Sequence, residues 1–391
     1  MDGRDPLIGP AMMYNYDLRN LYKKTELDMK EAQRENGLIP DICPEYVTGF
    51  EQWHTGYVDS PEWGSASIIN AWYVYRKYGD FSIVEQYYET MKKYLSYLTS
   101  KTHHYMLHHG LGDWLDIGPN PPFSQNTPVS VIASSIYYYD IKIMHWAATK
   151  LGKVEDAKEY ESLMKKVKEE FNLQYYDGQT GRYATGSQAA QAMSLVTGLV
   201  EEENRQKVFD HLVKDIINRG YATTAGDVGH PFVLAALTMY GRSDIINEMT
   251  NITDKPGYGY QVTCGATTLT ESWDGPNPDH PHDSQNHLML GSIEEWFYAG
   301  LGGIQLVRNE NPLDEIEIRP HFAKGIDYVQ VTHRHPYGEL SVHWRRIGDK
   351  EIEVNLVIPA NTTAKFYSEL DGSIQDLSNG RWQLILKQLE K

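Results

Sequence analysis

The spacing of hydrophobic residues changes once along the chain, near Val307. Before this point apolar residues recur at helical intervals, and after it they alternate with polar residues as in strands. The first part predicts about ten helices, each of a length usual in globular proteins. The predicted helices cover roughly residues 10–35, 61–78, 82–99, 127–151, 154–171, 187–199, 201–219, 231–240, 243–249 and 285–302. The pattern therefore predicts a mostly α protein with a β-rich C-terminal part.

The connections between these helices follow an alternating rhythm. Short glycine turns at 78–80 and 151–153 join helices into pairs, whereas longer loops rich in aromatic residues separate the pairs. Ser60-Pro61-Glu62 supplies a cap residue, a proline and an acid, which together favour the start of a helix. Helical hairpins in this rhythm predict an (α/α) toroid, with the long loops forming a cleft at one end.

The C-terminal part predicts several short strands. The alternating segments are 316–319, 328–332, 340–344, 352–356 and 364–367, with turns at 337–338 and 359–361. About 85 residues with this pattern predict a small antiparallel β-sandwich. The expected domains are thus a toroid over 1–306 and a β-domain over 307–391.

Composition narrows the class of ligand. The formal net charge of −17 disfavours binding to nucleic acids and to anionic membranes. No apolar run approaches the roughly 18 residues of a membrane span, and two cysteines imply no disulfide framework. The 28 Tyr and 9 Trp suit carbohydrate clefts, because their rings combine an apolar face with a polar group, but a Tyr-rich helical core explains them equally well. The first residues lack the features of a signal peptide, and the compartment and oligomeric state remain open.

The segment Gly265–Asp274 carries the strongest chemical signal. Glu271 lies two residues before Trp273, and Asn286-His287 follows a loop rich in His, Asn and Gly. A carboxylate activates water in sugar hydrolysis, and an indole covers the apolar face of a pyranose ring. The alternative is a carboxylate that only serves hydrogen bonds within a threonine-rich loop.

Four further residues in loops and at helix starts are candidates for sugar binding. Asp113 and Trp114 stand side by side in a glycine-rich loop, where they either contact a sugar or anchor the loop through a buried indole. Trp63 lies in the first turn of a helix and faces either the cleft or the core. His287 either binds a hydroxyl or holds the base, or it is an ordinary capping or core histidine.

Other chemistries find little support. The run His280–Asp283 fits no reliable zinc spacing, so we expect no metal and no cofactor. Cys43 has no evident His or Asn partner for a catalytic thiol, and no Gly-x-Ser-x-Gly motif is present.

In order along the chain, the motifs resemble the α-L-rhamnosidases of glycoside hydrolase family 78. The matching segments are 7–17, 37–42, 60–66, 110–114, 265–273, 286–287, 295–296 and 358–363. The resemblance implies an (α/α)6 barrel followed by a C-terminal β-domain. It also implies hydrolysis of terminal rhamnose with inversion, in which one carboxylic acid protonates the leaving oxygen and one carboxylate activates water.

The resemblance also implies roles for individual residues. Glu271 matches the general base, Trp63 and Trp114 match the aromatic walls of the rhamnose pocket, and His287 matches a hydroxyl-binding histidine. Asp113 neighbours that wall.

The chain departs from the family pattern at its start. The family's proton donor lies in an acidic segment before the first helix of this chain, where only Met1-Asp2-Gly3-Arg4-Asp5-Pro6 stands here. Asp2 and Asp5 are weak replacements. We therefore expect an (α/α)6 toroid that lacks its first helix and a hydrolase that is either intact or impaired, with two alternatives. One is a sugar-binding remnant without turnover, and the other is an (α/α)-toroid enzyme for another sugar, such as a uronic acid.

Overall fold

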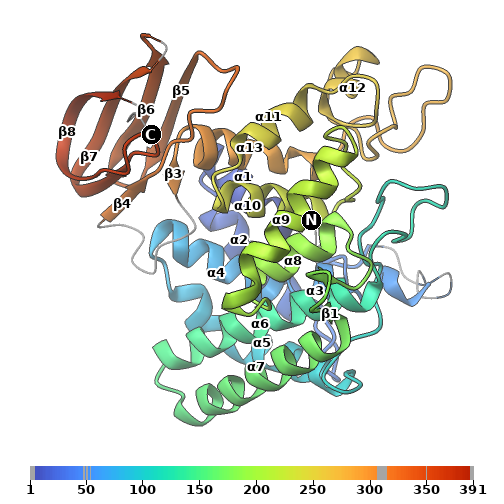
Figure 1. Ribbon diagram of the computed structural model, residues 1–391. Helices are drawn as coiled ribbons and strands as arrows, with labels where there is room; N and C mark the ends of the chain where they lie inside the picture. Colours follow the sequence, from blue (N-terminus) through green and yellow to red (C-terminus); the bar gives the residue numbers. More distant parts are fainter. Residues whose placement is uncertain are drawn as a thin grey trace.

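The computed structural model describes residues 5–387, apart from 47, 48, 50, 51, 53, 306–314 and 349. The chain forms a helical body followed by a β-domain (Figure 1). The α-helices are α1 (Asp5–Asn15), α2 (Arg19–Ala32), α3 (Pro61–Gly64), α4 (Ala66–Tyr78), α5 (Ser82–Ser100), α6 (Val129–Lys150), α7 (Val154–Tyr175), α8 (Gln188–Thr197), α9 (Arg205–Asn218), α10 (Gly229–Met239), α11 (Ser243–Asn251), α12 (Tyr258–Thr263) and α13 (Ile293–Glu295). Shorter 3₁₀ segments are η2 (Thr55–Tyr57), η3 (Glu202–Asn204) and η4 (Met289–Ser292), and η5 (Trp296–Leu301) is a π-helix.

Six segments form a closed inner ring. In chain order they are α1, α4, α6, α8, α10 and the composite helix η4–α13–η5. Each segment contacts the next, and the composite helix contacts α1, which closes the ring. Helices α2, α5, α7, α9 and α11 follow the first five inner members and pack outside them. In the part of the chain that the structure describes, six inner segments are therefore covered by five outer helices. This arrangement confirms the predicted six-hairpin toroid.

The hairpins form because the sequence supplies amphipathic helices and left-handed turn residues. Gly79 ends α4 at φ 65°, and Gly152 follows α6 at φ 69°, a backbone conformation that costs glycine nothing. Helix α5 buries one apolar stripe, which includes Val84, Met91 and Leu95, against the ring. The predicted short turns are thus confirmed.

The first predicted helix was wrong in its extent. The periodic pattern from Pro10 to Glu35 is divided into α1 and α2, and Pro10 lies inside α1. The chain reverses between them, and Asp17 accepts a hydrogen bond from the backbone N–H of Arg19 (3.2 Å). Apolar residues continue on both sides of the break, so the sequence pattern does not reveal it.

The β-domain is one six-stranded sheet with the order β3-β4-β7-β6-β5, and β8 pairs with β7. Its strands are β3 (Ile304–Gln305), β4 (Glu315–Ile318), β5 (Tyr328–His335), β6 (Gly338–Arg346), β7 (Glu351–Tyr367) and β8 (Ile374–Lys387), while β1 (Tyr176–Asp177) and β2 (Arg182–Tyr183) form a separate small hairpin. The predicted β-domain is confirmed, but not every strand pair is antiparallel. Strand β4 runs parallel to β7. The first half of β7 pairs with β6 in antiparallel direction, and the second half pairs with β4.

Strand β7 curls the sheet around its own core. The register between β7 and β8 shifts between Ile358 and Thr363, at the predicted turn around Pro359. Side chains from both halves, such as Trp344 and Phe366, then meet in one buried cluster. The predicted sandwich is therefore two halves of one curled sheet.

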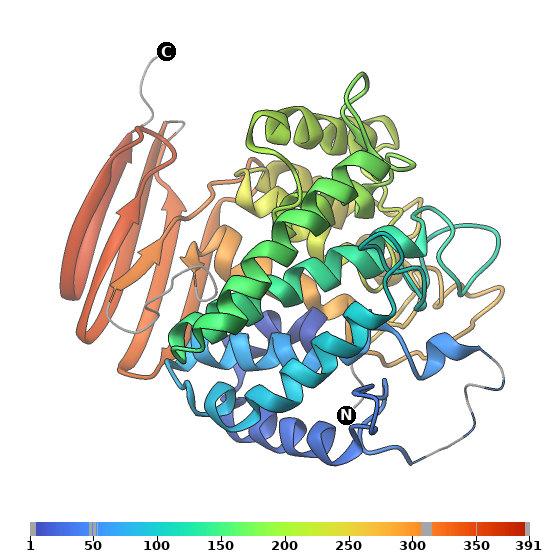
Figure 2. The same cartoon turned by 90° about the horizontal axis from the view of Figure 1, so that it is seen from below.

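The two domains meet at one end of the toroid (Figures 1 and 2). Tyr14 at the end of α1 stacks on Tyr298 (ring centroids 4.6 Å apart), and its hydroxyl donates to the Ile304 carbonyl (2.6 Å). The indole of Trp344 donates to the Leu301 carbonyl (2.8 Å). The predicted boundary at 306/307 lies outside the described residues, as does Asp2. Among the described helices, none has the length and apolar character to cross a lipid bilayer.

Candidate active site

The candidate site is built from four segments that lead into inner helices, and three of them carry the predicted site residues. Trp63 lies in α3 directly before α4, the loop with Asp113 and Trp114 precedes α6, and the loop with Glu271 and His287 precedes η4. The fourth segment, residues 219–228, precedes α10. The β-domain instead contacts the C-terminal end of α1 and the last inner segment, and the long loops lie on the other side of the helical body (Figure 2).

A buried carboxyl group, which the sequence analysis missed, joins α3 to the Asp113 loop. Glu62 has no exposed surface, and its Oε1 accepts a hydrogen bond from Gly112 N–H (3.1 Å). Gly110 has a φ of 119°, and a Cβ at this position would lie 2.6 Å from Glu62 Oε2. The two glycines of the Gly-Leu-Gly-Asp-Trp motif thus admit the carboxyl group and the turn around it. The signal in the sequence was the pairing of these glycines with Pro61-Glu62.

Asp113 holds two loops together. The buried Asp113 Oδ1 accepts a hydrogen bond from Gly229 N–H (2.7 Å) at the start of α10, and Asp227 N–H donates to the Trp114 carbonyl (2.7 Å). Burial raises the pKa of Asp113 to about 7, against the lowering effect of backbone N–H groups that include that of Gly229. The predicted contact of Asp113 with sugar hydroxyls is not favoured by this position, because its side chain serves the loop scaffold.

Trp273 also belongs to the scaffold in this structure. Its indole is only 2% exposed, and its Nε1–H donates to the Ala225 carbonyl (2.9 Å). His230 and Tyr258 pack edge-on against it, with ring centroids 4.7 and 5.0 Å away. The face that was predicted to cover a pyranose ring is therefore occupied by protein. Sequence proximity to Glu271 did not reveal this, because neighbouring side chains in an irregular loop point in different directions.

Glu271 and His287 come together as the sequence predicted. His287 Nε2 lies 3.9 Å from Glu271 Oε1, and the two side chains are 14% and 22% exposed. Ser284 N–H donates to Glu271 Oε2 (3.2 Å), while Glu271 N–H donates to the Ser284 carbonyl (2.8 Å). Met289 N–H approaches His287 Nδ1 (3.4 Å), which places the imidazole proton on Nε2, facing the carboxylate. Glu271 is thus oriented and partly accessible.

Aromatic rings gather in the loops that precede α3 and α6. The half-buried Trp114 meets Tyr57 edge-on (5.8 Å between centroids) and Phe123 edge-on (5.6 Å), and His54 lies against Phe123 (5.1 Å). Trp63 is 5% exposed and belongs to the toroid core. Of the predicted tryptophans, Trp114 is therefore the one best placed to contact a ligand. Tyr57 and Phe123 were missed, since isolated aromatic residues in long loops carry no periodic signal.

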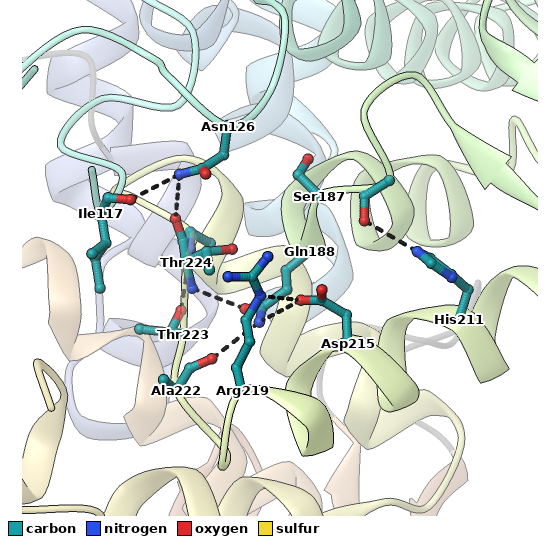
Figure 3. A network of polar contacts seen from close by, with 12 residues as sticks. Ile117, Asn126, Ser187, Gln188, His211, Asp215, Arg219, Ala222, Thr223 and Thr224 are labelled. Atoms are coloured by element: carbon teal, nitrogen blue, oxygen red, sulfur yellow. Dashed lines mark hydrogen bonds and ion pairs between the residues drawn. The ribbon is translucent and has the colours of Figure 1, made fainter. Parts of the chain in front are cut away.

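A polar network fixes the loops that carry this wall (Figure 3). The Asn126 side-chain amide donates to the carbonyls of Ile117 (3.0 Å) and Thr224 (3.3 Å), which joins the loop before α6 to the loop before α10. The Thr224 N–H donates to Gln188 Oε1 (3.0 Å), and Gln188 Nε2 donates to Asp215 (3.1 Å). The loops are therefore held by helices α8 and α9 below them, which favours a preorganised site.

The acid Glu62 supports a prediction on pH. Burial is the main cause that raises its pKa to about 8, so the folded protein keeps a proton that the unfolded chain releases above pH 4.5. The free energy of unfolding should therefore fall as pH rises from 4.5 to 8, by at most about 1.4 kcal/mol per pH unit from this group. Glu62→Gln stays neutral and should gain stability over wild type through this window, as urea unfolding at several pH values measures.

The control for this prediction is Glu62→Ala, which lacks an acceptor for Gly112 N–H and should be less stable than the glutamine variant at every pH. Parallel pH profiles of wild type and Glu62→Gln would contradict a protonated buried Glu62.

The other residues weighed from the sequence have the following surroundings. Among the described residues, no three His, Cys, Asp or Glu side chains are arranged to hold a metal ion. His282 pairs with Asp283 (2.8 Å) and Asp274 (3.4 Å). Cys43 is buried, its thiol donates to the Pro40 carbonyl (3.1 Å), and burial raises its pKa to about 12, so it does not form a reactive thiolate at neutral pH.

A ring of helical hairpins with a carboxylate at its loop end defines the class of six-hairpin glycosidases. The sequence profile of the bacterial alpha-L-rhamnosidase 6 hairpin glycosidase domain matches residues 3–301, and that of the bacterial alpha-L-rhamnosidase C-terminal domain matches residues 313–371. The chain belongs to the bacterial α-L-rhamnosidase family.

Individual relatives agree with this assignment. An alpha-L-rhamnosidase of Formosa agariphila is 28% identical over 381 residues, which are 95% of this chain and 40% of that protein. The crystal structure of the Streptomyces avermitilis alpha-L-rhamnosidase in complex with L-rhamnose is similar with a TM-score of 0.88 and 24% identity, over 99% of this chain and 38% of that one. The alpha-L-rhamnosidase structure from Dictyoglumus thermophilum is similar with a TM-score of 0.89 and 26% identity, over 98% of this chain and 45% of that one. The chain thus spans less than half the length of these relatives.

Proposed function

We propose that this chain carries the rhamnose site of an inverting α-L-rhamnosidase, with Glu271 as the general base. The observation that carries the proposal is the partly exposed carboxylate of Glu271 beside His287 at the loop end of the toroid. The family assignment supports the reaction class, and the neighbour solved with L-rhamnose supports the sugar.

The geometry supports a simple division of roles. Glu271 Oε2 is held by Ser284 N–H, and His287 presents Nε2 toward Oε1, so the carboxylate has a fixed direction. In an inverting reaction such a carboxylate takes a proton from a water molecule as that water attacks the anomeric carbon. A carboxylic acid on the other side of the sugar protonates the leaving oxygen at roughly 6.5–9.5 Å from the base.

The loops favour a neutral deoxyhexose over a uronic acid. A carboxylated sugar requires cationic partners, usually arginine. The segments 110–126 and 265–288 contain neither Arg nor Lys but several Asp residues. An aromatic wall beside acidic loops suits a sugar with apolar C–H surface and hydroxyl donors.

Calorimetry with L-rhamnose, together with turnover of an aryl rhamnoside, tests the proposal. We expect binding and release of rhamnose. An aryl substrate with a good leaving group is chosen because it departs with little proton assistance, so the assay reports on the base. Binding without turnover would support the alternative of a sugar-binding protein, and absence of both would overturn the proposal.

Trp114→Ala tests the aromatic wall. Loss of the ring that packs beside Tyr57 and Phe123 should weaken L-rhamnose binding roughly tenfold, which is about 1.4 kcal/mol. Calorimetry measures the change, and Trp382→Ala on the β-domain serves as a matched control with unchanged affinity. An unaltered affinity in Trp114→Ala would remove this residue from the site.

A further inference from the structure

A hollow lies at the end of the toroid where the helical body meets the β-domain. Its volume is about 430 Å³, and its walls come from the α1–α2 connection, the end of α4 and strand β5. The charged and titratable residues around it are Asp17, Arg19, Lys77, His333, Arg334 and His335. None of them belongs to the proposed rhamnose site.

The charge of this interdomain pocket is opposite to that of the protein. Its lining holds three cationic side chains, Arg19, Lys77 and Arg334, and one carboxylate, Asp17. The chain as a whole has a formal net charge of −17. The carboxylate is already engaged, because Asp17 binds the Arg19 guanidinium through both of its oxygens (3.1 and 2.7 Å). Lys77 and Arg334 therefore dominate the field inside the pocket.

Lys77 is buried without a carboxylate in contact. It is 3% exposed, and within the described residues its ammonium group has one hydrogen-bond partner, Nε2 of His333. His333 Nδ1 lies 2.9 Å from the Tyr14 carbonyl, which can only accept, so the imidazole proton is on Nδ1 and Nε2 accepts from Lys77. Two rings, Tyr14 and Tyr78, lie 5.7 and 5.9 Å from the Lys77 nitrogen. A buried ammonium with one neutral acceptor is costly unless an anion joins it.

His335 adds a further donor to the wall. Tyr337 N–H approaches its Nδ1 (3.3 Å), which places the imidazole proton on Nε2. His335 is 4% exposed and lines the same pocket, and Arg334 between the two histidines is exposed. The pocket thus combines a buried ammonium group, an imidazole N–H and an exposed guanidinium, which are the groups that bind oxyanions.

We propose that this interdomain pocket binds a small oxyanion, a phosphate or carboxylate group, with Lys77 and Arg334 as its principal ligands. The anion would pair with the buried Lys77 and link α4 to strand β5. Binding therefore joins the toroid to the β-domain and is independent of rhamnose.

Calorimetric titration of the full chain with inorganic phosphate, and separately with acetate, at fixed ionic strength tests this proposal. We expect saturable binding of at least one anion, and the pair of titrations separates phosphate from carboxylate preference. Arg334→Gln should weaken it at least about tenfold, because the bidentate donor is lost. Arg345→Gln is the matched control, since Arg345 is exposed on the adjacent strand β6 and pairs with Glu353 outside the pocket. Anion binding by this variant should equal that of wild type.

The pH dependence supplies a second readout. Burial lowers the pKa of Lys77, while Asp17 opposes this shift, and the neighbouring histidines also have lowered pKa values, of about 3 for His333 and about 4 for His335. Lys77 therefore loses its proton at lower pH than an exposed lysine, and affinity for the anion should fall over that range. The hydrogen bond from Arg19 to Asp17 raises the pKa of Arg19, so this guanidinium stays charged throughout.

Lys77→Met should abolish anion binding if the variant folds. If the variant does not fold, the comparison with Arg334→Gln decides alone. Absence of saturable binding by both anions in the wild type, or equal binding by wild type and Arg334→Gln, would overturn the proposal.

Discussion

Glu271→Gln is expected to lower kcat for release of rhamnose from an aryl rhamnoside by about 10²–10⁴-fold, because the amide cannot accept a proton from the attacking water. The hydrogen bond from Ser284 N–H to Oε2 and the neighbouring His287 remain possible with the amide, so the affinity for L-rhamnose should change little. Initial rates and calorimetry on the same preparation measure the two effects separately.

The matched control is Glu155→Gln, which replaces an exposed glutamate on α7 far along the chain from the loops of the site. Its rate should equal that of wild type. Unchanged turnover in Glu271→Gln would remove the general base from the proposal, whereas a loss of both binding and turnover would indicate that Glu271 positions the sugar.

Trp273→Ala is expected to reduce the free energy of unfolding by about 3–5 kcal/mol, since it empties a buried indole site. The indole fills the space between His230 and Tyr258 and satisfies the Ala225 carbonyl, so its removal also leaves that acceptor without its donor. Urea unfolding followed by far-UV circular dichroism measures the loss.

Trp382→Ala again provides the comparison, because this indole is only half-buried on β8 and should cost much less. The prediction separates two roles for Trp273. A sugar platform would weaken rhamnose binding in the folded variant with little change in stability, and that outcome would contradict the scaffold role.

The positions of most helices and turns were predictable because they depend on the local sequence pattern. Apolar spacing along α5 determines a helix with few contributions from distant residues. The glycines that end α4 and follow α6 determine the turns in the same way. The change to an alternating pattern marked the β-domain for the same reason. The break between α1 and α2 was missed, because apolar residues continue on both sides of it.

The candidate site was predictable in part. The pairing of Glu271 with His287 followed from their places at the two ends of one loop, and the structure brings them within 3.9 Å. The direction of each indole was not predictable. Trp114 is half-buried, while Trp273 is buried, although both follow a polar residue in a loop. Which face a loop side chain presents depends on the segments packed against it, here the segment with Ala225.

By itself, the sequence determined the class of protein: paired helices, a terminal β-domain, and an acid with aromatic residues in long loops. These features rest on local periodicity and residue chemistry, which every segment carries alone. Only the tertiary structure decided which groups meet. It buried Glu62 beneath the Gly112 loop, curled one sheet around its own core, and gathered Lys77, His333 and Arg334 from segments more than 250 residues apart. Such contacts depend on chain closure over long separations, and no local pattern encodes them.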